Sequence, residues 1–135
     1  MTRQITFRGK YSDKHGWVYG HYYNNCDCGV NQDIIVYHNI AEGTGTHSII
    51  NQKYLGQFTG LVDKNGKEIY EGDYLRDSFG EIFEVIFGNG RWIDKAVNGG
   101  AEMQLYRGNG GVAEYKEVVG NIYDTPELAA KKRGV

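Results

Sequence analysis

The sequence has very little proline, little cysteine and no long hydrophobic run. Its 135 residues include one Pro and two Cys. Two cysteines cannot supply the framework of a disulfide-rich secreted domain, and Cys26 and Cys28 stand so close that a bond between them would be strained in a strand. No segment approaches the ~20 consecutive apolar residues of a transmembrane helix, and Met1–Lys10 lacks the apolar run of a signal peptide. These absences predict a soluble, cytoplasmic protein.

Positive charge is missing from a long part of the chain. No Lys or Arg occurs between Lys14 and Lys53, and the formal net charge of the whole chain is −2. This balance provides no global attraction to nucleic acid or to an anionic membrane. The basic cluster 131–133 is interpreted as a solvated tail rather than a phosphate-binding patch.

Glycine and tyrosine are abundant instead. The chain has 20 Gly and 11 Tyr, and 40% of its residues are hydrophobic. High Gly together with aromatic and β-branched residues is typical of short strands joined by tight turns. The length fits one domain. We expect a single domain over residues 1–135, with sub-lobes 1–52 (N-terminal strands) and 53–135 (a barrel with a C-terminal helix).

Strand-like runs recur along the chain with turn signals between them. The predicted strands are Gln4–Arg8, Gly16–Tyr23, Asp33–His38, His47–Asn51, Tyr54–Phe58, Tyr74–Arg76, Glu81–Phe87 and Tyr115–Tyr123. Gly20 inside the second run indicates a bulge or a close backbone approach. Thr125-Pro126-Glu127 has the order of an N-cap, a first helical residue and an acidic first turn, which predicts a short C-terminal helix. The pattern predicts an all-β, mainly antiparallel fold: a small SH3-like β-barrel with additional N-terminal strands.

The strongest turn signals lie in the segment 54–76. Asn65-Gly66 separates LVDK from KEIY, and this arrangement predicts a type I′ hairpin with positive φ at both residues. Glu71-Gly72-Asp73 predicts a second tight turn, and Asn89-Gly90 a further two-residue hairpin. Asn98-Gly99 and Asn109-Gly110 are expected at turns of a meander. The turn and motif residues of the segment are Gly56, Phe58, Gly60, Asn65, Gly66, Glu71, Gly72 and Asp73.

The run from Gly56 to Asp73, GQFTGLVDKNGKEIYEGD, resembles the YopX family of phage and prophage proteins. The segments 5–10 and 16–20 are similar to the family's opening, and 118–124 with 126–128 is similar to its ending. The resemblance covers nearly the whole chain and is weakest over 22–52 and 94–112. It implies a small β-rich fold and an origin in a mobile element of a bacterial host. The family implies no catalytic residue and no established activity.

The acids Asp63, Glu68, Glu71 and Asp73 form the first candidate site, for a cation or for acid–base chemistry. A calcium loop starting at Asp63 fails, because its sixth residue is Glu68 and its twelfth is Tyr74. Acids beside tight turns more often accept backbone hydrogen bonds or stay hydrated. We therefore interpret these carboxylates as structural.

A zinc site is the second candidate. Cys26 and Cys28 with His21, His38 or His47 have the right ligand types, but the cysteine spacing is not Cys-x2-Cys and no second compact pair follows. The chain also lacks a GxSxG motif, and the Gly-rich stretch 108–111 lacks the Lys and Ser/Thr of a phosphate loop. We therefore predict no metal, no cofactor and no enzymatic activity.

Binding to a macromolecule is left as the function. Aromatic and basic residues on a small barrel can stack on bases and contact phosphates; the candidates are Tyr70, Tyr74, Arg76, Phe83, Arg91 and Trp92. The acidic balance instead favours aromatics packed inside the barrel. The segment 21–52, rich in Tyr and Ile but without Lys or Arg, has the composition of an interface core and equally of buried strands.

The sequence therefore predicts a phage or prophage accessory protein that is not an enzyme and acts by binding or self-assembly. Its expected partner is a second copy of the chain or a host or phage protein. The alternative function is a nucleic-acid-binding module.

Overall fold

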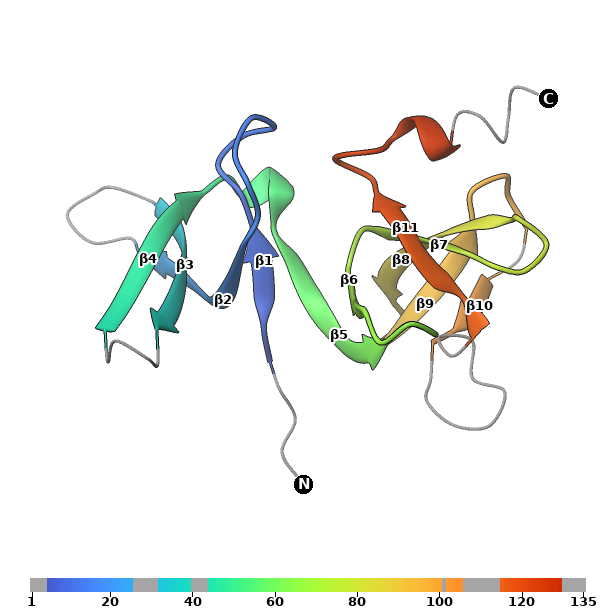
Figure 1. Ribbon diagram of the computed structural model, residues 1–135, viewed down its shortest axis with the longest axis horizontal. Coiled ribbons are helices and arrows are strands. Elements are labelled where there is room, and N and C mark those ends of the chain that lie inside the picture. Colours follow the sequence, from blue (N-terminus) through green and yellow to red (C-terminus); the bar gives the residue numbers. More distant parts are fainter. Residues whose placement is uncertain (1–4, 26–31, 40–43, 101, 106–114, 130–135) are drawn as a thin grey trace. The chain divides into compact units, whose positions relative to one another are not determined.

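The fold is all β and mainly antiparallel, as the sequence predicts. The computed structural model of the protein describes residues 5–25, 32–39, 44–100, 102–105 and 115–129. The strands in these ranges belong to two sheets, and the chain divides into two compact units, Met1–Phe58 and Thr59–Val135 (Figure 1). The division between the units falls within strand β5 (Gly56–Val62), whereas the sub-lobes expected from the sequence divide between residues 52 and 53.

The N-terminal unit is built on antiparallel strands in the spatial order β4-β3-β2-β1-β5. The first four strands are β1 (Phe7–Gly9), β2 (Val18–Asn25), β3 (Gln32–Asn39) and β4 (Thr44–Ile50). A short 3-10 helix, η2 (Gln52–Tyr54), joins β4 to β5. Each of these four strands overlaps a segment that the sequence predicted as a strand, with ends displaced by a few residues.

The side chains of β2, β3 and β4 alternate between an inner and an outer face. Ile35 pairs with Tyr22 on one side and Ser48 on the other, and this inner row contains the fully buried Ile35. Gly20 lies where the sequence indicated a close approach, since a Cβ there would overlap the carbonyl oxygen of Val36. A side chain at this position would force β2 away from β3.

The C-terminal unit contains a five-stranded antiparallel sheet in the order β10-β9-β8-β7-β11. Its strands are β7 (Asp73–Arg76), β8 (Ile82–Gly88), β9 (Arg91–Ala96), β10 (Glu102–Gln104) and β11 (Glu117–Asn121), and β6 (Glu68–Tyr70) pairs with β5. The core of the unit is formed by Ile69, Leu75, Val85 and Leu105, with Leu61, Trp92 and Val118 packed against it.

The expected barrel closure is not found within the described ranges. The five-stranded sheet ends at β10 on one side and β11 on the other. The register of β11 shifts between Val118 and Gly120, which marks a bulge. A Cβ at Gly120 would overlap Thr125 Oγ1. The absence of a side chain at Gly120 therefore leaves room for the segment that follows β11 to pack against this strand.

The C-terminal helix begins where the sequence predicts. Residues 127–129 are helical, and the amides of Leu128 and Ala129 donate to the carbonyl oxygens of Thr125 and Pro126 at 3.1 and 3.2 Å. None of the helices in the described part of the chain has the length and apolar character needed to cross a membrane.

Two Asn-Gly pairs form different turns. Asn89 and Gly90 have φ of 54° and 77° between the paired residues Gly88 and Arg91, so this turn is the predicted two-residue hairpin. At Asn65-Gly66 only the glycine has positive φ, 83°, and the type I′ prediction is wrong. The amide of Asp63 donates to the Lys67 carbonyl oxygen at 2.8 Å, which leaves a three-residue loop with Gly66 in the left-handed position.

Candidate functional site

The aromatic residues predicted to stack on bases are mainly internal. Tyr70, Tyr74 and Phe83 are buried, and in the structure described here their rings offer no exposed face to a ligand. Burial also raises the pKa of Tyr74 above the usual value of 10.0, which keeps its hydroxyl protonated. These three rings therefore pack in the interior, which is the alternative to base stacking that the acidic balance of the sequence favoured.

The other three predicted residues lie at or near the surface. Arg76 is exposed, and its Nη2 lies 2.5 Å from Glu117 Oε1. This hydrogen bond lowers the pKa of the Glu117 carboxyl. Arg91 is exposed and its Nη1 donates to Gln104 Oε1 at 3.4 Å. Half-buried Trp92 makes an edge contact with Phe87 at 4.9 Å between ring centroids. The six residues are therefore divided between the interior and the surface.

Most of the candidate acids act as hydrogen-bond acceptors at or beside turns. Asp63 is buried; its Oδ1 accepts from the amides of Asn65 and Lys67 at 2.8 and 2.9 Å, and its Oδ2 accepts from the Val118 amide at 2.9 Å. Asp73 Oδ2 accepts from the Tyr70 amide at 2.7 Å. Glu68 accepts from the Tyr70 hydroxyl at 3.3 Å, and Glu71 is half-buried. No group of three His, Cys, Asp or Glu side chains that could hold a metal occurs in the part of the chain that the structure describes.

Part of the candidate zinc site that the sequence analysis rejected lies outside the described residues. Cys26 and Cys28 lie outside the described residues, as do Asn109-Gly110 and the basic cluster 131–133. Nothing is described of the side chain of His38. His21 and His47 are exposed on β2 and β4, and each occupies a position paired with Val36 of β3.

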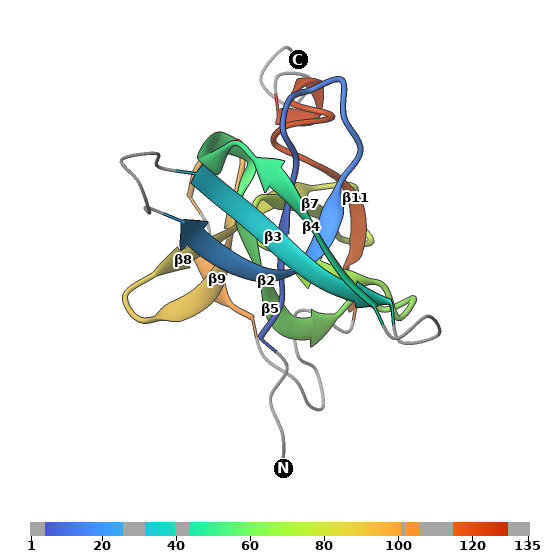
Figure 2. The same ribbon diagram turned by 90° about the vertical axis from the view of Figure 1, so that its left-hand side faces the viewer.

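An uncharged sheet face, here called the outer face, combines these histidines with apolar side chains. Cross-strand register aligns His21, Val36 and His47 in one row and Tyr23, Ile34 and Ile49 in the next, on the neighbouring strands β2, β3 and β4 seen in Figure 2. Tyr23 is 53% exposed and Ile49 is 45% exposed. The sequence marked this segment as an interface or a set of buried strands, and one face of it proves to be exposed.

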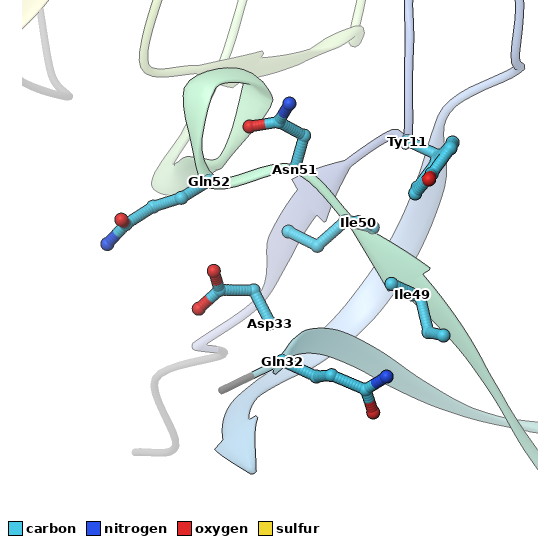
Figure 3. A pocket seen from close by; sticks show the side chains of 7 residues that line it. All are labelled: Tyr11, Gln32, Asp33, Ile49, Ile50, Asn51 and Gln52. Atoms are coloured by element: carbon cyan, nitrogen blue, oxygen red, sulfur yellow. The ribbon is translucent and has the colours of Figure 1, made fainter. Parts of the chain in front are cut away.

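A groove of about 530 Å³ lies at one end of the same strands, lined by Tyr11, Gln32, Asp33, Ile49, Ile50, Asn51 and Gln52 (Figure 3). Asp33 Oδ1 accepts hydrogen bonds from the Tyr22 hydroxyl at 2.5 Å and from Asn24 Nδ2 at 3.0 Å. The bond to Asp33 raises the pKa of Tyr22 above 10.0, so the phenol stays a donor and holds the carboxylate. Asn51 is fixed by accepting the Lys53 amide at 3.0 Å. Sequence reasoning missed the groove because its residues come from separate segments.

A cluster of cations and rings lies elsewhere in the N-terminal unit. The Arg8 guanidinium and the Lys10 ammonium each lie 4.7 Å from the centre of the Trp17 ring. The ammonium groups of Lys10 and Lys53 lie 5.2 and 5.4 Å from the centre of the Tyr54 ring. These cation–π contacts engage the two rings with the chain's own cations. They stabilise the unit and compete with stacking by a base.

A buried ion pair was also missed by sequence reasoning. Lys116 Nζ lies 2.6 Å from Asp94 Oδ2, and both side chains are buried in the C-terminal unit. The ammonium lies 3.2 Å from the centre of the Phe83 ring. Burial raises the pKa of Asp94, and the hydrogen bond from Lys116 opposes that rise. Neither residue stands in a motif, and Asp94 lies in the polar-looking segment RWIDKA.

Comparison with known proteins supports the fold and the family. The crystal structure of protein EF1440 from Enterococcus faecalis is similar, with a TM-score of 0.61 and 20% sequence identity over 95% of this chain and 99% of that chain. At this identity the likeness shows the fold alone. No curated protein sequence matches the chain. The family model described as YopX protein matches residues 6–130, a range that covers most of each unit and all residues of the groove. The chain therefore belongs to the YopX family.

Proposed function

We propose that this chain is a phage or prophage accessory protein that is not an enzyme and acts by binding protein, first of all a second copy of itself, through the outer face. The observation that carries the proposal is the row Tyr23–Ile34–Ile49, in which the end members are about half exposed. Tyrosine supplies a large amphipathic contact area and is enriched in interface cores, where charged residues are depleted.

Charge favours a second copy as the occupant of the outer face. The six residues of the face include no Lys, Arg, Asp or Glu, so a two-fold axis would bring the same neutral rows together without like-charge repulsion. Strand β4, TGTHSII, supports the same partner. It is an edge strand, and it carries neither the Lys nor the Pro with which sheets commonly protect their edges.

The size of the face predicts weak association. Three strands spaced about 4.8 Å apart and some seven residues long cover roughly 350 Å². A stable interface buries about 800 Å² per partner, so the face alone supports a reversible dimer with a dissociation constant in the micromolar range or weaker.

Light scattering of the full chain between about 1 and 100 μM tests the proposal. We expect the weight-average mass of the wild type to rise with concentration, whereas Tyr23→Glu stays monomeric because the new carboxylate would be buried unpaired. Phe79→Glu is the matched control, since Phe79 is 91% exposed in the other unit, and it should behave as the wild type. A strictly monomeric wild type at ~100 μM, or an equal effect of both substitutions, would contradict the proposal.

A further inference from the structure

Two histidines lie beside the apolar row of the outer face. His21 on β2 and His47 on β4 are both paired with Val36 of β3, and both are exposed. Each histidine is two residues from a member of the apolar row, Tyr23 or Ile49, so strand alternation places it on the same face. The strands involved are seen in Figure 2. The surface proposed above for self-association therefore includes both imidazoles.

The strands of this face bring no carboxylate to the histidines. The one acidic residue within the described strands β2, β3 and β4 is Asp33, which alternates onto the inner face with Ile35. Its Oδ1 accepts from Tyr22 and Asn24, which lie on that inner face as well. Tyrosine hydroxyls are neutral over the pH range in which imidazoles titrate. A charged histidine on the outer face thus finds no negative partner on these three strands.

The neighbours of the face add positive charge or none. Arg8 of β1 is paired with Tyr19 of β2, two residues before His21, and a guanidinium is charged at every relevant pH. β4 is the edge strand of its sheet, so no further strand of the described sheet lies beside His47. Nothing is described of the side chain of His38 on β3. The fixed charge described beside the face is therefore positive, and it cannot neutralise an imidazolium.

Protonation affects the free chain and the paired chain unequally. β2 and β4 flank β3 and lie two strand spacings apart, roughly 10 Å, which exceeds the Debye length of about 8 Å at physiological ionic strength. Two exposed imidazolium groups at this separation therefore repel each other weakly in the free chain. A two-fold axis through the face would instead bring four imidazoles into one interface, where water is removed and unpaired like charges are costly.

We propose that His21 and His47 make self-association through the outer face dependent on pH: neutral imidazoles permit two copies to pair, and protonation separates them. The switch rests on the association proposed above and adds its regulation. Because the paired state disfavours the charged imidazole, association releases protons, and by linkage a fall in pH weakens it. The change is expected around pH 6.5, where histidine ordinarily titrates.

The charge of the whole chain predicts the opposite dependence. The isoelectric point is near 6.1, and the formal net charge at pH 7 is −2. As the pH falls from neutral toward the isoelectric point, repulsion between whole molecules decreases, which favours association. Weaker association over the same interval therefore reports the local charge of the outer face rather than the net charge.

Light scattering of the full chain at about pH 7.5 and pH 5.5 tests the switch, in buffer with EDTA so that no metal bridges the imidazoles. We expect the dissociation constant of the wild type to rise at least about tenfold at the lower pH. Circular dichroism at both pH values monitors folding. In His21→Lys a permanent charge replaces a titrating one, so association should already be weak at the higher pH.

Variants that cannot be protonated locate the effect. His21→Gln/His47→Gln should change its dissociation constant by less than about threefold between the two pH values, whatever its affinity at the higher one, because glutamine does not titrate. Each single Gln variant should lose about half of the logarithmic change. His15→Gln is the matched control, since exposed His15 lies in the loop before β2 with its Nδ1 2.7 Å from Ser12 Oγ, and it should keep the pH dependence of the wild type.

Three results would overturn the switch: equal association of the wild type at both pH values, the same pH dependence in the single and double Gln variants as in the wild type, or loss of that dependence in His15→Gln. In the first case Tyr23→Glu would still separate the copies, so association through the outer face would stand. A wild type that is strictly monomeric at both pH values contradicts the association itself and the switch with it.

Discussion

Lys116 and Asp94 form a buried ion pair, with Nζ 2.6 Å from Oδ2. Burying two charges costs several kcal/mol for each, and the attraction between them repays that cost only while both are present. Lys116 also contacts the face of Phe83, and its carbonyl oxygen accepts from the Lys64 amide at 3.1 Å. The pair thus fixes the segment before β11 against β9 in the C-terminal unit.

Lys116→Met should lower the free energy of unfolding by about 3–5 kcal/mol, because it leaves the Asp94 carboxylate buried without a partner. The double variant Lys116→Met/Asp94→Leu should recover most of the loss, since neither charge is then buried. Urea denaturation of the wild type and both variants measures this. A double variant as unstable as Lys116→Met would show that packing, rather than an unpaired charge, causes the loss.

The raised pKa of Asp94 predicts the direction of a pH dependence. A carboxyl whose pKa is higher in the folded than in the unfolded chain contributes stability that is fully present below its ordinary value of 3.8 and is lost as the pH rises through the folded value. The cost of Asp94→Asn should therefore be largest at acidic pH and decrease as the pH rises through this window. Urea denaturation of both proteins at a series of pH values checks this, and a cost that grows with pH would mean that the pKa is lowered.

Two hairpins of the C-terminal unit use an aspartate in the same way. Asp77 Oδ1 accepts from the amides of Phe79 and Glu81 at 2.9 and 3.0 Å, as Asp63 Oδ1 does from the amides two and four residues later. Both loops end with a glycine of positive φ, 83° at Gly66 and 84° at Gly80. The two loops differ in one hydrogen bond, because Asp63 Oδ2 also accepts from the Val118 amide.

That difference predicts unequal effects of one substitution. Asp63→Asn should cost about 2 kcal/mol, because an amide group placed toward the Val118 amide leaves a partly buried donor unsatisfied. Asp77→Asn keeps the acceptor that its loop uses and should cost about 0.5 kcal/mol or less. Thermal or urea denaturation compares the two. Equal losses would mean that the bond between Asp63 and Val118 contributes little.

Local sequence signals were enough for the strands and several turns but not for the contacts between distant segments. The apolar run of β3 and the glycine at position 20 are local features, so the sequence predicted a strand at the first and a close backbone approach at the second. The type of turn at Asn65-Gly66 depends on the carboxylate of Asp63, and a propensity for Asn-Gly does not include that bond. The Asp-x-x-Gly spacing shared with Asp77 would have revealed it. The groove beside Asp33 depends on strand register, and no single segment records its residues.

Gly66 provides a test of that corrected turn. Its φ of 83° is strained for a residue with a side chain, and a Cβ there would meet nothing within 4 Å. Gly66→Val should therefore destabilise the protein by ~1 kcal/mol or more through backbone strain alone, and Gly66→Asn should cost less because Asn tolerates this region better. Gly16→Ala is the matched control, since Gly16 also has open space around it but no positive φ. An unchanged melting temperature in Gly66→Val would mean that the three-residue loop is misassigned, whereas equal losses at Gly66 and Gly16 would point to a general effect of side chains in loops rather than to the left-handed conformation.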